Sequence, residues 1–499
     1  MIYRFVRKNM KKYLQLLVGI IAIVLLITAC GNPSRQHNPM EREDIVGETE
    51  KIDLQSELWV MYNRADFTQE LLEAMAELFS AEHPETSVRL EQIPTDENML
   101  QRLRTQIMAG NGPDAYILKS DNELFPDVYQ SMYNGLFEDI SGYYDSDTQL
   151  GKDALHTGIM NAGVINEGRY VLPLRFDFPV AYVDVEQFES LGGSLDMIEG
   201  GIINIFDNFL DTQNPNLISG VTISNYLERV SAFNFLPNAI DYDVRQVLLT
   251  TEDVALHLRS LQKVRAIGKA VAAGNDSTLF CIRFPFHFNE NIVGLTHSVW
   301  PDHICMYIGR AYGLLTSTVY EKISGKDIEM IPIAAADGDL VADVTHFAAI
   351  GYGCDDPGLA YEFIRLFLTE EGQYMNCQAL YSSSGMYMGW PVRIEGSING
   401  ILDIPEVRNR FREGINRYKQ KSGIPFATEI EIPSLSEEDI QFLNVEFNRI
   451  TYSSSMEIEF WTTATSALND ANTYEALDVD IDTIALEFVD ELKWHLAEG

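Results

Sequence analysis

Short apolar blocks alternate with amphipathic segments at the start of the folded chain. Residues 58–62 form a continuous apolar run, typical of a strand buried on both faces of a parallel sheet. Residues 66–79 and 95–107 carry apolar side chains at helical spacing. Strand-like segments at 88–91 and 115–118 complete the order β-α-β-α-β. This order predicts an α/β fold with a doubly wound sheet and helices on both of its faces.

Polar side chains stand where the first and third of these strands end. Ligands of doubly wound sheets bind beyond the carboxyl ends of the strands, so these positions are candidate ligand contacts. They are Asn63, Arg64, Asp121 and Asn122. Other interpretations stay open: solvated loop positions for Arg64 and Asn122, and the cap of a following helix for Asp121.

The N-terminus has a basic segment at 4–12, an apolar run at 14–26 and then Ile27-Thr28-Ala29-Cys30. The apolar run is shorter than the roughly 20 residues that span a bilayer, which favours a signal peptide over a permanent anchor. The segment resembles the bacterial lipoprotein signal. This resemblance implies that residues 1–29 are removed and that Cys30 receives a diacylglycerol. Residues 30–55 are rich in polar and charged residues and predict a flexible tether.

Composition supports a packed protein and narrows its partners. Hydrophobic residues make up 46% of the chain and aromatic residues 11%, which is enough for well-packed cores. The formal net charge is −38, so contact with nucleic acid or with anionic lipid headgroups is disfavoured.

Cysteine and histidine positions give no metal-binding pattern. Cys281, Cys305, Cys354 and Cys377 are widely spaced, and two disulfides are possible in an exported protein. The apolar neighbours of Cys281 and Cys305 favour free thiols. His297 and His303 near Asp302 form a local cluster that is typical of a surface turn, so we expect neither metal nor cofactor.

Several motifs occur in the order found in family 1 extracellular solute-binding proteins, the maltose-binding-protein group. The chain resembles this family at Gly110-Asn111-Gly112-Pro113-Asp114, at 135–140, at 168–174, at Ile331-Pro332 and at 360–373. The resemblance implies a two-lobed, periplasmic-binding-protein-like fold of type II, in which each lobe is a doubly wound sheet and a hinge of several crossovers joins the lobes.

The same resemblance implies a division of the chain into lobes. Residues 56–175 with 346–390 are expected to form the N-terminal lobe, and 176–345 with 391–499 the C-terminal lobe. The chain is expected to cross between them near 175–178, near 344–347 and just after 390–393. Hinged lobes of this kind close over a ligand.

Further ligand contacts follow from this resemblance. It implies that Tyr62, at the end of the first strand, contacts the ligand, with ordinary strand packing as the alternative. It implies that Asp177 is an acidic hinge residue able to accept sugar hydroxyls, and that Tyr312 beside Arg310 is an aromatic platform of the far lobe. Trp390 lies between Gly389 and Pro391, a segment in which burial of an indole is not expected. We therefore include Trp390 among the candidate contacts.

We therefore interpret the chain as the substrate-binding lipoprotein of an ABC importer. It is expected to be a monomer outside the cytoplasm, anchored by Cys30, that delivers a small polar solute, a sugar or oligosaccharide, to a membrane permease. Two alternatives remain: presentation of the ligand to a sensor kinase, and an exported glycosidase. The sequence contains no His-Glu-x-x-His, Gly-x-Ser-x-Gly, P-loop or Gly-x-Gly-x-x-Gly motif, so we expect no enzyme activity.

Overall fold

The structure is a computed structural model that describes only part of the chain. The described residues are 56–63, 69–212, 214, 216–217, 220–223, 239–256, 258–259, 305–310, 326–335, 338–383, 389–393, 441, 445–453, 456 and 480–498. The expected signal peptide, Cys30 and the tether lie outside them.

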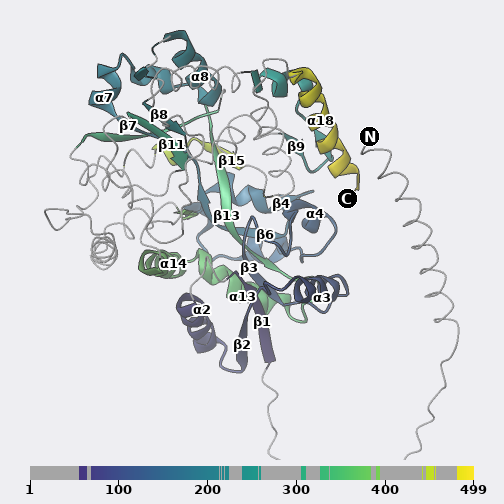
Figure 1. Ribbon diagram of the computed structural model, residues 1–499. Coiled ribbons are helices and arrows are strands. Elements are labelled where there is room, and N and C mark those ends of the chain that lie inside the picture. Colours follow the sequence, from purple (N-terminus) through teal and green to yellow (C-terminus); the bar gives the residue numbers. More distant parts are fainter. Residues whose placement is uncertain are drawn as a thin grey trace, which may run out of the picture. The chain divides into compact units, whose positions relative to one another are not determined.

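Seven strands of the described residues form the larger sheet (Figure 1), in the order β14-β6-β13-β3-β1-β2, with β15 paired to β13. β1 is parallel to both β2 and β3, whereas β13 is antiparallel to β3 and to β6. The bounds are β1 Ser56–Tyr62, β2 Thr86–Gln92, β3 Ala115–Lys119, β6 Val171–Asp177, β13 Leu340–Ile350, β14 Trp390–Pro391 and β15 Ile450–Ser453.

The predicted β-α-β-α-β order is confirmed. Helix α2 (Gln69–Glu82) joins β1 to β2, and α3 (Glu97–Met108) joins β2 to β3. The side chain of Asp96 accepts a hydrogen bond from the Met99 amide at 3.0 Å, which caps the start of α3. Both helices bury one apolar side, and each fully buried apolar side chain stabilises the fold by about 1.5–3 kcal/mol. These side chains are Leu71, Leu72, Met75 and Phe79 of α2 and Leu100, Leu103 and Ile107 of α3.

A second sheet within the described residues has four strands in the order β12-β7-β11-β8. Two short hairpins, β4-β5 and β9-β10, stand apart from it. The bounds are β4 Val164–Ile165, β5 Gly168–Arg169, β7 Pro179–Asp184, β8 Val221–Ile223, β9 Ile240–Asp241, β10 Gln246–Val247, β11 Met306–Arg310 and β12 Ile328–Pro332.

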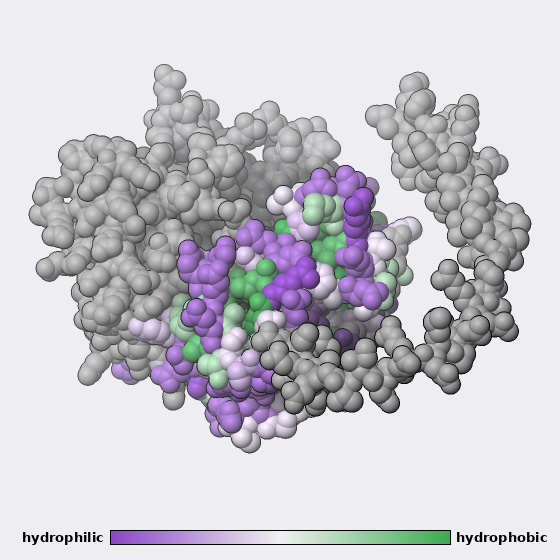
Figure 2. Space-filling view, turned by 90° about the horizontal axis from the view of Figure 1, so that it is seen from below, coloured by the Kyte–Doolittle hydropathy of each residue, from purple (hydrophilic) through white to green (hydrophobic). Residues whose placement is uncertain are grey.

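The remaining helices lie between these strands in sequence, apart from α18, which comes after the last strand. They are α4 Val128–Tyr133, α5 Ser141–Ser146, α6 Thr157–Met160, α7 Val185–Ser190, α8 Gly201–Thr212, α13 Pro357–Arg365, α14 Glu370–Ser383 and α18 Ile481–Glu498, with 3-10 turns at Lys152–Ala154, Asn161–Gly163, Leu195–Ile198 and Leu366–Leu368. In Figure 2, hydrophilic residues cover much of the described surface on the face seen from below, with smaller apolar areas between them. This is the surface expected of helices that turn their apolar sides inward.

Two hydrophobic cores accompany the two sheets. The first core contains buried side chains of the larger sheet and of α2, α3 and α13. The second contains residues of β7 and β11 together with Phe488, Val489 and Leu492 of α18. Val180 and Tyr182, on the other face of β7, belong to the first core, so the second sheet has packed side chains on both faces.

The Gly-x-Gly-Pro-Asp motif fixes the start of β3 against β1. Gly110 has φ of +71°, the left-handed conformation that ends α3. The Asp114 carboxylate accepts a hydrogen bond from the Trp59 amide at 2.7 Å, and burial raises the pKa of this carboxyl group. A Cβ atom on Gly351 would lie 2.2 Å from the Pro113 carbonyl oxygen, so only glycine permits this close approach.

The three expected crossover segments lie side by side in the larger sheet. Phe176 on β6 is opposite Val344 on β13 and opposite Trp390 on β14. A single residue, Phe178, separates β6 from β7, so one extended stretch of chain serves both sheets. The expected lobe boundaries at 175/176 and 345/346 fall inside β6 and β13. Continuous strands therefore run through both positions.

His156 is a buried histidine next to these strands. Its side chain is 4% exposed and contacts the rings of Phe176 and Phe447 edge-on, with centroid distances of 5.6 Å. Its backbone amide donates to the Val392 carbonyl at 2.8 Å. Burial lowers the pKa of His156 from 6.5 to about 4. The ring is therefore neutral in the folded protein at neutral pH.

We predict that this histidine makes the fold sensitive to mild acid. Its stabilising effect is complete above pH 6.5 and is lost as the pH falls toward 4, because the unfolded chain binds a proton that the folded chain does not. At pH 5 the loss is about 2 kcal/mol. Urea unfolding at pH 7.5 and pH 5 should show a larger fall in stability for the parent chain than for His156→Phe. Equal falls in the two proteins would contradict the assignment.

Candidate functional site

The carboxyl ends of three strands meet at one edge of the larger sheet. β1 and β3 are parallel neighbours, and β6 runs in the same direction because both β3 and β6 are antiparallel to β13. Asn63, the loop at 120–122 and Asp177 therefore lie along the same edge. Ligand sites of doubly wound sheets form at such an edge.

Two asparagines hold the loop at this edge in place. The Asn63 side-chain oxygen accepts a hydrogen bond from the Lys119 amide at 2.9 Å, which ties the end of β1 to the end of β3. Asn122 donates to the Lys119 carbonyl at 2.8 Å and accepts from the Phe125 amide at 2.8 Å. Asn122 is 1% exposed, so its interpretation as a solvated loop residue is wrong. Both of its polar groups are needed inside the protein.

Asp121 projects from this loop and is exposed. The helix that follows is α4, and its cap is Asp127, whose carboxylate accepts from the Gln130 amide at 2.6 Å. The interpretation of Asp121 as the helix cap is therefore wrong, because the helix begins later than the apolar pattern indicates. Asp121 thus places an exposed carboxylate at the carboxyl edge of the sheet.

Tyr62 is a buried strand residue. Its side chain is 3% exposed, and its hydroxyl accepts a hydrogen bond from the Gln92 side-chain amide at 2.9 Å. This bond joins β1 to the edge strand β2. The contact gives Tyr62 a packing role in this structure.

A row of buried polar side chains follows the strands at the crossover. Asp177 on β6 is opposite Asp343 on β13, and Arg175 is opposite His346. All four are at least 94% buried. Arg175 also donates to the Asn376 side chain of α14. Of these four residues only Asp177 was predicted as a site residue. Charged residues inside the apolar runs 171–177 and 340–350 indicate the other three as well.

Trp390 belongs to an aromatic cluster on the other face of the same strands. Side chains alternate between faces along a strand, so Phe176 and Asp177 point to opposite sides. Trp390 is paired with Phe176, and its ring contacts Phe178 at 6.1 Å and Phe447 at 5.1 Å. It is 2% exposed, so the expectation that this segment cannot bury an indole is wrong. The neighbouring rings of β6 and of Phe447 supply the apolar surroundings.

The far-lobe contacts are only partly described. Arg310 ends β11, where its backbone is opposite Pro179, two residues after Asp177. The structure thus brings the backbone of Arg310 close to the crossover. Other residues considered from the sequence lie outside the described residues, namely Arg64, Tyr312, His297, Asp302 and His303.

The described part of the chain contains no group of three His, Cys, Asp or Glu side chains placed to hold a metal ion. Cys305 and Cys354 are free thiols, and burial raises the pKa of each to about 12. For these two residues the preference for free thiols is confirmed. Cys281 and the side chain of Cys377 lie outside the description. None of the helices in the described ranges is both long and apolar enough to cross a membrane.

Comparison with known proteins gives a family match for one part of the chain and a fold. Residues 64–196 match the family described as bacterial extracellular solute-binding protein. The chain matches no curated protein.

Several solved structures have a similar fold. The sugar-binding protein MalE from Xanthomonas citri is 10% identical with a TM-score of 0.57, and the match covers 89% of this chain and 98% of that one. The galacto-N-biose/lacto-N-biose I-binding protein of Bifidobacterium longum is 15% identical with a TM-score of 0.54, over 88% and 97% of the chains.

The GacH receptor of Streptomyces glaucescens, solved without ligand and with acarbose, is 12% identical with a TM-score of 0.53, over 89% and 99% of the chains. These similarities confirm the two-lobed, periplasmic-binding-protein-like α/β fold. The sequence match over 64–196 agrees, in that part of the chain, with the resemblance to family 1 extracellular solute-binding proteins.

Proposed function

We propose that this protein is the substrate-binding lipoprotein of an ABC importer and that its ligand is a carbohydrate bound at the carboxyl edge of the larger sheet. The observation that carries the proposal is the convergence of Asn63, Asp121 and Asp177 on one edge, where β6 continues into the second sheet. A ligand held there would contact groups of both sheets.

The chemistry of this edge suits a polyhydroxylated ligand. Ionised carboxylates only accept hydrogen bonds, so the exposed Asp121 can receive hydroxyl donors of a sugar, and the buried Asp177 is proposed to do so when the lobes move. The amide of Asn63 is already bonded to the Lys119 backbone, which fixes the edge rather than the ligand. Tyr312 and Arg310 are proposed to complete the site from the second lobe, with the tyrosine ring against a sugar face.

The similar structures support a sugar as the ligand class. Three such proteins were solved in complex with cycloalternan, lacto-N-biose and mannotriose, respectively. We propose the lobe division 56–175 with 346–390 and 176–345 with 391–499, and closure of the lobes around the ligand. Permease genes beside the gene for this protein would favour delivery to a permease over presentation to a sensor kinase.

A thermal-shift screen against a carbohydrate panel tests this proposal. A ligand that binds only the folded protein increases its free energy of unfolding by mass action, by about 2.7 kcal/mol at a ligand concentration of 100 times Kd. The melting temperature rises accordingly. We expect one or a few neutral sugars or oligosaccharides to produce a shift, and no product to form on prolonged incubation. A panel without any shift would contradict the carbohydrate assignment, and turnover of the ligand would favour a glycosidase.

We predict that Asp177→Asn weakens binding of the sugar from this screen by about 10- to 100-fold, because a hydrogen bond to a charged group is worth about 1.5–3 kcal/mol. Asparagine keeps the volume of this buried side chain. The control is Asp153→Asn, which removes the same charge from an exposed position. Titration calorimetry of both variants is decisive: equal affinities would place the ligand elsewhere. Tyr312→Ala should weaken binding similarly through loss of stacking.

Cys30 is proposed to anchor the protein to the outer side of the membrane. Residues 1–29 would be the signal peptide and residues 30–55 the lipidated cysteine and tether, as the motif Ile27-Thr28-Ala29-Cys30 implies. We predict that Cys30→Ser abolishes metabolic labelling with palmitate and releases the protein or leaves its signal uncleaved. Palmitate labelling that persists in this variant would refute the lipid site.

A further inference from the structure

The β9-β10 hairpin, residues 240–247, packs against both hydrophobic cores. Ile240 and Val247 lie against the second core, which accompanies the four-stranded sheet. Tyr242, at the turn between them, lies against the first core. In sequence the hairpin falls between β8 and β11, two strands of the four-stranded sheet. One short hairpin therefore belongs to one core and reaches the other.

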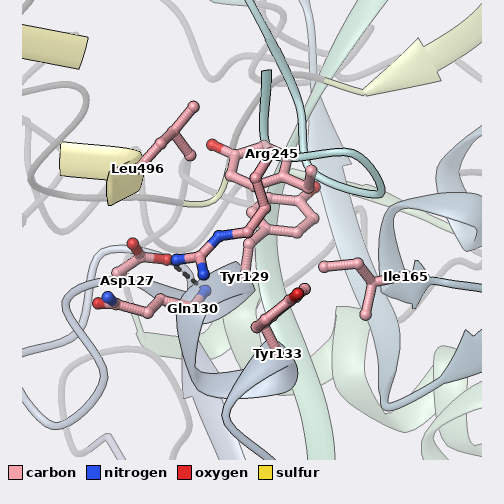
Figure 3. A pocket seen from close by; sticks show the side chains of 8 residues that line it. Asp127, Tyr129, Gln130, Tyr133, Ile165, Arg245 and Leu496 are labelled. Carbon is pink, nitrogen blue, oxygen red and sulfur yellow. Dashed lines mark hydrogen bonds between the residues drawn. The ribbon is translucent and has the colours of Figure 1, made fainter. Parts of the chain in front are cut away.

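Three contacts join the turn of the hairpin to elements that lie between β3 and β6. The rings of Tyr242 and Tyr129 are stacked, with centroids 4.1 Å apart and planes at 12°. The Arg245 guanidinium lies 4.5 Å from the ring centroid of Tyr133 on α4. Figure 3 shows Arg245 beside the tyrosines of α4, with Ile165 and Leu496 also lining the pocket.

The third contact is a hydrogen bond between two turns. The Asp243 carboxylate accepts from the Asn166 amide at 2.7 Å, across 77 residues of sequence. Both turns are preformed for this contact. Asn166 and Arg245 have φ of 49° and 51°, and the Asp241 carboxylate accepts from the Asp243 amide at 3.1 Å. The backbone shape that presents these groups is thus fixed locally.

These contacts are polar or aromatic and lie near the surface. Val244 at the tip of the turn is 64% exposed, and Tyr133 under the guanidinium is 44% exposed. Within the described residues Arg245 forms no ion pair, and its guanidinium lies over the Tyr133 ring. Such contacts can separate and re-form without exposing a large apolar surface, unlike the packed cores on either side.

We propose that the hairpin 240–247 is a clip that stabilises one relative arrangement of the two lobes and thereby adjusts ligand affinity. The inference rests on the proposed function, in which the lobes rotate about the paired strands β6 and β13. Rotation would move Tyr242 and Asp243 relative to α4 and the β4-β5 turn. The clip then adds its free energy to one arrangement only, and a ligand that prefers either arrangement must respond to it.

The test removes the clip without touching the proposed ligand contacts. In the double variant Tyr242→Ala/Asp243→Ala the stacked ring and the carboxylate are lost. Tyr242→Phe keeps the stack, and Val244→Ala changes an exposed residue of the same turn, so both serve as controls. Circular dichroism and melting temperature establish that each protein is folded. Asp243→Ala alone, at an exposed position, keeps the test available if the double variant fails to fold.

Affinity for the sugar found in the screen is the first measurement. We expect the double variant to change Kd by about 3- to 30-fold, with both controls like the parent chain. Tighter binding means that the clip stabilises the arrangement that the ligand disfavours, and weaker binding means the reverse. A double variant that binds within 1.5-fold of Val244→Ala, taken as roughly the precision of such comparisons, overturns the clip.

A second measurement needs no ligand and separates the two proposals. Spin labels on cysteines placed at the exposed positions Glu77 of α2 and Glu189 of α7 report the distance between the lobes. We expect a shifted or broader distance distribution in the double variant. An unchanged distribution overturns the clip even where a sugar binds. A changed distribution in a protein that binds no sugar supports the clip and contradicts the proposed function. Parent chain treated with the label corrects for its own thiols.

Discussion

The pairing of β6 with β13 and β14 is the constraint on which the rest of this structure depends. It sets three distant segments of the chain side by side, each at the point where the family resemblance places a crossover. Because only Phe178 separates β6 from β7, a change in the direction of this strand must move the second sheet relative to the first. In the proposed function, hinge motion and ligand contact therefore involve the same residues.

The two faces of these strands have opposite chemistry. One face carries Phe176, Phe178 and Trp390, which pack with Phe447 and with neutral His156. The other face carries Arg175 and Asp177, with Asp343 opposite the latter. Two carboxylates on directly paired positions disfavour each other, and burial raises this cost. Buried, paired carboxylates of this kind make the crossover a candidate for binding.

Sequence reasoning was sufficient for the elements whose pattern is local. The first three strands and α3 follow from apolar periodicity. The positions of Asn63 and the loop at 120–122 also follow, because parallel strands end at one edge.

Other features depend on contacts that no local pattern contains. The burial of Trp390 requires Phe178 and Phe447, which are distant in sequence, and the buried role of Asn122 requires the Lys119 and Phe125 backbone. The apolar pattern also does not reveal that α4 is capped by Asp127 and not by Asp121. The contacts of hairpin 240–247 join segments that sequence periodicity leaves unrelated.

Hydrogen exchange with and without bound sugar tests the central claim most directly. The proposed ligand position is the carboxyl edge of the larger sheet. Two amides lie next to it, that of Lys119, which donates a hydrogen bond to Asn63, and that of Ser120, which donates to the Thr345 carbonyl. Exchange should slow in peptides that cover residues 117–125 and 175–180, because a ligand stabilises the conformation it binds. Protection that leaves both peptides unchanged and appears only elsewhere in the protein would contradict the account.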